Sequence, residues 1–303
     1  MRASYYALIL VLSFLLPACG KKAEIQYSDA PEVEAMADPS LYPAAVMVVL
    51  PEGRGICTGT FISPRTVLTA AHCTNRNGRY TVISSFGTFS SYDRINLGPG
   101  VLDDPEDISV IIFSTDVAQR ARGQVAVVGS EAHAGDKIRI IGFGCNNLDT
   151  RRGAGIKRTG TNHVASVGQY IQLDTPFSAS TRRVANVDAK PILGPKDQAG
   201  SCFGDSGGPM LISDDVENEL VGVTHAGGDN GSYIISQYIN VGAANIQAFL
   251  HDVDDGYSLG IYDVCNPSDP FQGSPCADSA SMDVMEYLTK AFWRIVSWFK
   301  AWF

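Results

Sequence analysis

The hydrophobic residues of the chain fall into short runs, and glycine, proline or polar turn residues separate one run from the next. Many of these runs are rich in valine, isoleucine and threonine, which is typical of β-strands bounded by turns. The expected strands are Val46–Leu50, Gly59–Ile62, Thr66–Thr69, Thr81–Ser85, Ile108–Phe113, Gln124–Val128, Lys137–Phe143, His163–Val167, Tyr170–Asp174, Pro209–Ile212, Leu220–Thr224 and Tyr233–Ser236. Strands at such short intervals, with almost no helical period between them, predict an all-β fold, an antiparallel sandwich or barrel.

Helical periodicity belongs to the last part of the chain. It first occurs in Val241–Leu250, and a longer amphipathic pattern covers Ser281–Phe303. Charges at Lys290, Arg294 and Lys300 interrupt the second segment, so it has no apolar run long enough to span a bilayer. This tail helix either lies in a membrane interface or docks on the protein itself or on a partner, and the sequence leaves both interpretations open.

The N-terminal residues have the layout of an export signal. Arg2 supplies a positive charge, and the apolar stretch that follows it is too short to be a convincing membrane span. The stretch ends in Leu-Pro-Ala-Cys-Gly, which resembles the lipobox of bacterial lipoproteins and implies that Cys19 is acylated. The alternative is an ordinary signal peptide that is cut after Ala18. We expect a signal peptide at 1–18, a lipidated tether or pro-segment at 19–40, and a protein anchored on the periplasmic or extracellular side of a bacterial membrane, or secreted.

Composition narrows the class of protein. The chain has 303 residues, of which 45% are hydrophobic and 18% charged, as in a globular protein. Its formal charge of −9 argues against a nucleic-acid-binding face, and no glycine-rich nucleotide motif is present. Seven cysteines leave six once Cys19 is set aside, which suggests three disulfides in an exported protein. No cysteine–histidine cluster has zinc-ligand spacing, which disfavours a structural metal. We also expect no cofactor.

Candidate chemistry centres on Ser201–Pro209, where Ser206 is flanked by glycines. Glycine permits a sharp turn, and such a turn can aim the N–H groups of Gly204 and Ser206 at one point, where an oxyanion would form. A serine hydroxyl needs an adjacent base to act as a nucleophile, and the candidate base is His72, far upstream. Asp107, at the start of a predicted strand, can hold the imidazole tautomer and stabilise its cation.

These segments together resemble the trypsin/chymotrypsin family of serine endopeptidases, and the order His72, Asp107, Ser206 matches that of the family's catalytic residues. The resemblance implies two antiparallel six-stranded Greek-key β-barrels with the triad between them, followed by a C-terminal helix. The implied activity is hydrolysis of peptide bonds in proteins or peptides through an acyl-enzyme. The implied organisation is a protease domain at 41–253, with barrels at about 41–125 and 126–240, and a disulfide loop with the amphipathic tail at 254–303.

The resemblance extends to the cysteines and to the substrate pocket. Gly200 stands where trypsin has the aspartate that binds Lys or Arg, so we expect an apolar or aromatic P1 residue rather than a basic one. His225 stands where the family has a serine near the catalytic aspartate, and it could hydrogen-bond Asp107. Because glutamate-specific relatives place a histidine near this strand, an acidic P1 residue is the alternative. The expected disulfides are Cys57–Cys73, Cys145–Cys202 and Cys265–Cys276, and the expected pocket residues are Gly200, Ser201, Phe203, His225, Gly227, Gly231 and Tyr233.

One departure from the family concerns activation. Family zymogens free an Ile-Val-Gly-Gly-like N-terminus, whose ammonium pairs with the aspartate before the nucleophile, here Asp205. No such block occurs between residues 20 and 45. A buried, unpaired carboxylate is costly, so the charge of Asp205 has to be accommodated in some other way. A cryptic cut, for example near Ile25, would free an N-terminus to pair with it. Otherwise a different cation pairs with Asp205, or its carboxylate is not buried. The missing terminus also leaves a second interpretation open, a catalytically silent protein that uses the protease fold to bind peptides.

Overall fold

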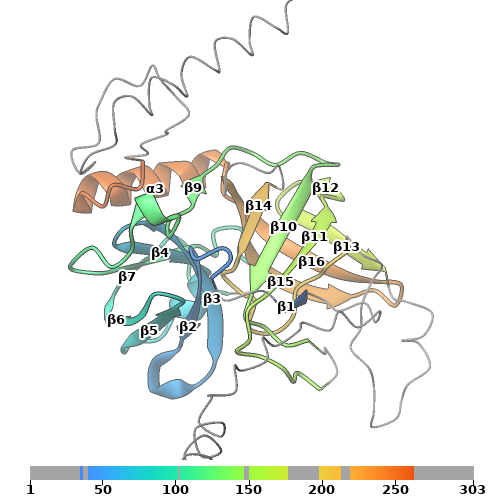
Figure 1. Ribbon diagram of the computed structural model, residues 1–303. Coiled ribbons are helices and arrows are strands. Elements are labelled where there is room, and N and C mark those ends of the chain that lie inside the picture. Colours follow the sequence, from blue (N-terminus) through green and yellow to red (C-terminus); the bar gives the residue numbers. More distant parts are fainter. Residues whose placement is uncertain are drawn as a thin grey trace, which may run out of the picture. The chain divides into compact units, whose positions relative to one another are not determined.

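The computed structural model describes residues 35–36, 40–101, 103–146, 150–176, 198–212 and 219–262 (Figure 1). The expected signal peptide, Cys19, the Cys265–Cys276 pair and the tail helix at 281–303 lie outside the described residues. The described residues form two curled β-sheets with few helices.

The first sheet comes from the N-terminal half of the described chain. Its strands are β2 (Ala45–Val49), β3 (Ile56–Ser63), β4 (Thr66–Thr69), β5 (Tyr80–Ser84), β6 (Gly87–Ser91), β7 (Asp93–Asn96) and β8 (Ser109–Ile112). They lie in the order β6-β5-β2-β3-β4-β8-β7, and each pair of neighbours is antiparallel. The chain therefore returns to β4 with β8, the strand that follows Asp107.

The second sheet comes mainly from the C-terminal half. Its strands are β1 (Ala35–Met36), β9 (Val127–Val128), β10 (Lys137–Gly142), β11 (Arg158–His163), β12 (Ser166–Val167), β13 (Ile171–Pro176), β14 (Pro209–Ile212), β15 (Glu219–Asp229) and β16 (Tyr233–Asn240). The order is β1-β11-β10-β14-β15-β16-β13-β12, with the short β9 pairing parallel to β15 and all other pairs antiparallel. Apart from β1, which is blue, Figure 1 shows this sheet in green to orange beside the blue-to-green first sheet.

One helix of several turns follows the second sheet. Helix α3 (Ala244–Tyr257) begins after the expected start at Val241 and continues beyond the expected end at Leu250. Its C-cap, Ser258, has a left-handed φ of 51°. The remaining helical elements are short: η1 (Pro51–Gly53), α2 (Ala71–Thr74) and η2 (Arg120–Arg122). Within the described residues, no helix is both long and apolar enough to cross a membrane.

An apolar core joins the two sheets to α3. Ile62 and Leu68 of the first sheet, Val223 and Ile239 of the second, and Leu250 of α3 are all buried in one cluster. Each sheet also encloses a cluster of its own. Burial of these side chains stabilises the contact between the sheets, and the residues of the candidate site meet at that contact.

The predicted fold, two curled antiparallel sheets with a C-terminal helix, is confirmed. The sheets contain seven and nine strands rather than six each, and three strands of the second sheet, β1, β9 and β12, are only two residues long. Strands β6, β7 and β11 were not predicted, because they are mostly polar and lack the apolar run that is typical of a buried strand. The segment expected as a tether also contributes β1, which pairs with β11.

Candidate active site

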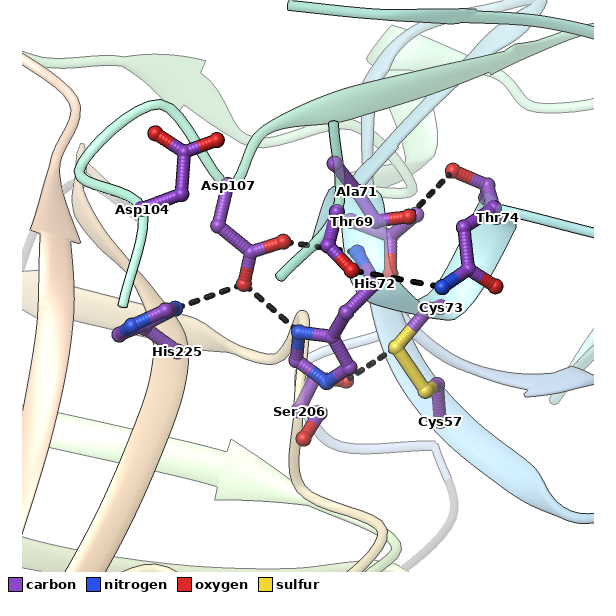
Figure 2. Close-up of polar contacts among 12 residues, drawn as sticks. Cys57, Thr69, Ala71, His72, Cys73, Thr74, Asp104, Asp107, Ser206 and His225 are labelled. Carbon is purple, nitrogen blue, oxygen red and sulfur yellow. Dashed lines mark hydrogen bonds and ion pairs between the residues drawn. A yellow bond between two sulfur atoms is a disulfide. The ribbon is translucent and has the colours of Figure 1, made fainter. Parts of the chain in front are cut away.

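The pairing of β4 with β8 brings His72 and Asp107 together. Thr69 on β4 lies opposite Ser109 on β8, so the residue that follows β4 by a few positions meets the residue just before β8. His72 lies on α2, where its Nδ1 is 2.6 Å from Oδ2 of Asp107 and its backbone N–H donates to Oδ1 at 2.7 Å (Figure 2). Both carboxylate oxygens therefore hold the same histidine, one through its ring and one through its backbone.

Asp107 is fully buried, yet it remains a carboxylate. Burial acts to raise the pKa of Asp107, but hydrogen bonds from His225 and His72 outweigh it and hold the pKa below its usual value. The ionised carboxylate is thus available to accept the Nδ1 proton of His72. That contact leaves Nε2 of His72 as the ring nitrogen able to accept a proton.

His225 lies behind the carboxylate of Asp107. Its Nδ1 is 2.6 Å from Oδ2 of Asp107, and its ring stacks on Tyr170 with centroids 4.9 Å apart. The register of β15 against β16 shifts between Thr224 and Ala226, so His225 is the bulged residue. A β-bulge changes the direction in which a side chain points. His225 is 1% exposed. Of its two expected roles, the structure shows the contact with Asp107.

The loop that carries Ser206 is bound to the first sheet through Thr58 of β3. The N–H of Thr58 donates to the carbonyl of Ser206 at 2.8 Å, and its hydroxyl donates to the carbonyl of Gly204 at 2.9 Å. The same hydroxyl accepts the N–H of Phe143 at 3.1 Å. Thr58 therefore contacts both sides of the loop, and the sequence alone had not singled it out.

Ser206 lies beside His72, as Figure 2 shows. The sulfur of Cys73, the residue after His72, is bonded to Cys57 and lies 3.7 Å from the carbonyl oxygen of Ser206. Between these described residues there is no hydrogen bond from the Ser206 hydroxyl to the His72 ring. A serine hydroxyl changes position by rotation about one bond, and contacts of this kind tighten when substrate binds.

Within the described structure, the two candidate oxyanion-binding N–H groups have no protein acceptor. Gly204 has a φ of +102° and Gly207 a φ of +82°, so glycine is needed at both. Among the described residues, the N–H groups of Gly204 and Ser206 donate to no protein atom, while the N–H of Gly207 donates to Thr224. The turn is thus able to present two donors to a developing negative charge.

Asp205 is buried next to the nucleophile and accepts two backbone hydrogen bonds. The N–H groups of Gly144 and Cys202 donate to its two oxygens at 2.6 and 2.7 Å. Burial is the main influence and raises the pKa of Asp205 to about 6, although the two hydrogen bonds act to lower it. Of the alternatives that the sequence left open, placement outside the core is excluded, since Asp205 is 2% exposed.

Two disulfides brace the site. Cys57–Cys73 joins β3 to α2 next to His72, and Cys145–Cys202 joins the turn after β10 to the segment before Ser206. These are the two pairings within the described residues that the family resemblance implied. The first disulfide thus ties the helix of His72 to β3, and the second ties the segment before Ser206 to the turn after β10.

The expected pocket residues differ in their surroundings. A Cβ on Gly200 would meet Oγ1 of Thr175 at 2.9 Å and Oγ of Ser236 at 3.4 Å, and a Cβ on Gly227 would meet Oγ of Ser201 at 3.4 Å. These glycines therefore lie against a surface rich in hydroxyl groups. The other expected residues are the exposed Phe203 and Tyr233, the open Gly231 and the buried His225.

Among the residues that the structure describes, two clusters have donor atoms close enough together to suggest a metal. They are Cys57, His72 and Cys73, and His72, Asp107 and His225. In the first, the two sulfurs are joined in a disulfide. In the second, both Nδ1 atoms already contact Oδ2 of Asp107. The donors therefore fit a hydrogen-bond network better than a set of metal ligands.

Comparisons with known proteins identify relatives of this chain in sequence and in fold. Residues 34–246 match the sequence model of the family described as Trypsin. Trypsin from Saccharopolyspora erythraea is 28% identical over 228 residues, which cover 67% of this chain and 95% of that protein. Neutrophil elastase from Mus musculus is 29% identical over 178 residues, 54% of this chain and 62% of that protein. A solved structure of a Glu endopeptidase in complex with MPD matches the fold with a TM-score of 0.53 at 18% identity, over 75% of this chain and 98% of that one.

Proposed function

Since the chain belongs to the trypsin family, we propose that it is an exported serine endopeptidase that acts through His72, Asp107 and Ser206. The observation that carries this proposal is the pair of hydrogen bonds between His72 and Asp107, beside the Ser206 loop. A histidine held in this way presents Nε2 as a base, which is what a serine nucleophile requires.

The proposed reaction has two halves. Ser206 Oγ attacks the scissile carbonyl and its proton passes to Nε2 of His72, while the N–H groups of Gly204 and Ser206 bind the oxyanion. His72 then gives this proton to the departing amine, and an acyl-enzyme remains. A water molecule attacks the acyl group, loses a proton to His72 and releases the acid, and the same proton returns to Ser206. Asp107 stabilises the histidine cation in both halves.

The proposed P1 residue is apolar or aromatic. A basic residue is disfavoured because Gly200 supplies no carboxylate at the base of the pocket. An acidic residue is the alternative, and one protein with a similar fold is a Glu endopeptidase. The position of His225 weighs against it, because its ring contacts Asp107 and Tyr170. Peptides that differ only in P1 as Phe, Glu or Arg test this order, and faster cleavage after Glu than after Phe would reverse it.

A fluorophosphonate probe tests the catalytic proposal. We expect the purified chain to be labelled on Ser206, and expect Ser206→Ala to abolish the labelling. Ser114→Ala, which removes an exposed hydroxyl away from the site, should label like the wild type. If the wild-type chain remains unlabelled even after limited proteolysis, the endopeptidase proposal fails. Peptide binding without turnover would then favour the silent binding protein, the alternative that the missing Ile-Val-Gly-Gly-like block between residues 20 and 45 leaves open.

Membrane attachment is a separate part of the proposal, and it rests on the sequence around Cys19. When bacteria that express the protein grow with a labelled fatty acid, the wild-type protein should become labelled. The variant Cys19→Ala should be exported without the label. Equal incorporation in both would exclude Cys19 as the acylated residue.

A further inference from the structure

Arg158 is a buried cation that the proposed reaction does not use. It opens β11 and is 3% exposed. Its guanidinium donates to three backbone carbonyls, those of Gly144 at 2.7 Å, Gly153 at 2.7 Å and Ile156 at 3.2 Å. Within the described part of the chain, no carboxylate lies within 4 Å of it. A buried charge without a nearby opposite charge is costly, so its position calls for an explanation.

Gly144 connects this cation to Asp205. Its carbonyl accepts from Arg158, and its N–H donates to Oδ1 of Asp205 at 2.6 Å. One residue therefore lies between a buried cation and a buried anion, and both charges orient it. The positive charge of Arg158 also acts to lower the pKa of Asp205, against the larger effect of burial.

The packing around Asp205 leaves it little freedom. A Cβ on Gly142 or Gly144 would overlap the Asp205 carboxylate. Gly142 in turn lies opposite Arg158 in the pairing of β10 with β11. The Cys145–Cys202 disulfide then closes the same turn onto the segment that holds Asp205.

Asp205 stands between Gly204 and Ser206, whose N–H groups are the candidate oxyanion donors. The position of its carboxylate therefore sets the shape of the 202–206 loop. We propose that Arg158 is a positioning residue, which supplies from within the chain the positive charge opposite Asp205. It thereby holds this loop ready to bind an oxyanion without release of a new N-terminus. This inference rests on the proposed endopeptidase function.

The test compares three variants by the rate at which a fluorophosphonate labels Ser206. Arg158→Gln removes the charge, Arg158→Lys keeps it without the planar fork, and Arg152→Gln removes an exposed charge from the same loop. One oxyanion donor is worth about 100-fold or more in rate, so we expect about 100-fold slower labelling for Arg158→Gln. Arg158→Lys should lose about tenfold, and the control should be unchanged. Methylguanidinium in the buffer should restore part of the rate of Arg158→Gln.

The N-terminus of the labelled wild-type protein gives a second measurement, which needs no variant to fold. We expect intact mass and N-terminal sequencing to find labelled chains that have no new terminus between residues 20 and 45. The inference is overturned if only chains cut in that interval are labelled, or if folded Arg158→Gln labels at the wild-type rate. A wild-type protein that is never labelled would instead refute the proposed function, so the two failures are distinguishable.

Discussion

Nδ1 of His225 lies 2.6 Å from Oδ2 of Asp107, the oxygen that Nδ1 of His72 also contacts at 2.6 Å. One carboxylate oxygen therefore accepts from two imidazoles. Both hydrogen bonds act to lower the pKa of Asp107 against the effect of burial. Loss of the second donor should raise that pKa and weaken the hold on His72.

Two substitutions of His225 separate its donor from its ring. Phenylalanine keeps a ring to stack on Tyr170 but donates nothing, whereas asparagine can still donate to Asp107. A hydrogen bond to a charged group contributes about 1.5–3 kcal/mol, so we expect His225→Phe to slow fluorophosphonate labelling about tenfold or more. We expect His225→Asn to stay within about threefold of the wild type. The acid limb of the pH–rate profile should move to higher pH in His225→Phe only, and equal profiles would contradict the role given to His225.

Thr58 and Thr60 offer a matched pair on β3, since both are buried. The hydroxyl of Thr58 contacts Gly204 and Phe143, whereas that of Thr60 has no partner in the described structure. Thr58→Val leaves two partly buried backbone groups, the carbonyl of Gly204 and the N–H of Phe143, without this partner. We therefore expect it to lower the free energy of unfolding by about 1–3 kcal/mol and to slow labelling. Thr60→Val should leave both unchanged or slightly increase stability. Urea unfolding of the two variants measures this, and equal losses would show that the loop does not depend on Thr58.

Gly207 tests how closely the Ser206 loop must approach the first sheet. Its φ is +82°, and a Cβ there would overlap Oγ1 of Thr69 and the carbonyl oxygen of Thr58. Gly135 has a similar φ of +92° but open space around it. We expect Gly135→Ala to lose only about 1–2 kcal/mol of stability, the strain of a left-handed residue. Gly207→Ala should lose clearly more and should no longer be labelled, as thermal melts and the probe will show.

Much of the fold follows from apolar runs. The expected strands at Thr66–Thr69 and Pro209–Ile212 coincide with β4 and β14 because both are short, largely buried and bounded by turns. Strand β11 could not be predicted in the same way, since it reads Arg-Thr-Gly-Thr-Asn-His and is held by its neighbours β10 and β1. Tertiary pairing there outweighs local preference.

The residues of the candidate site also differ in whether the sequence could predict their roles. The order of His72, Asp107 and Ser206 resembles that of the catalytic residues of the trypsin/chymotrypsin family, and this resemblance implied that the three would meet. The contacts of Thr58 and Arg158 depend on loops that close from distant positions, and no local pattern marks them. The direction in which the His225 side chain points depends on a bulge in β15, and only the register of the sheet reveals this bulge.

The raised pKa of Asp205 predicts how stability depends on pH. Its pKa is about 6 in the folded protein against 3.8 for an ordinary aspartate, so between these values the folded state binds more protons than the unfolded state. Stability contributed by this group is therefore highest below about pH 4 and falls as the pH rises to about 6, by about 3 kcal/mol in all. Asp205→Asn should remove this part of the slope in urea unfolding measured across that range. Asp93→Asn, at an exposed position, should keep it.

The same measurement links Asp205 to Arg158. Since the charge of Arg158 acts to lower the pKa of Asp205, Arg158→Gln should raise that pKa further. The fall in stability should then extend to higher pH than in the wild type, whereas Arg152→Gln should leave it in place. If Arg158→Gln and the wild type lose stability over the same pH interval, the two buried charges are not coupled. Gly144 then transmits no charge effect between them, and the hold on the Ser206 loop must come from the disulfide and the backbone hydrogen bonds alone.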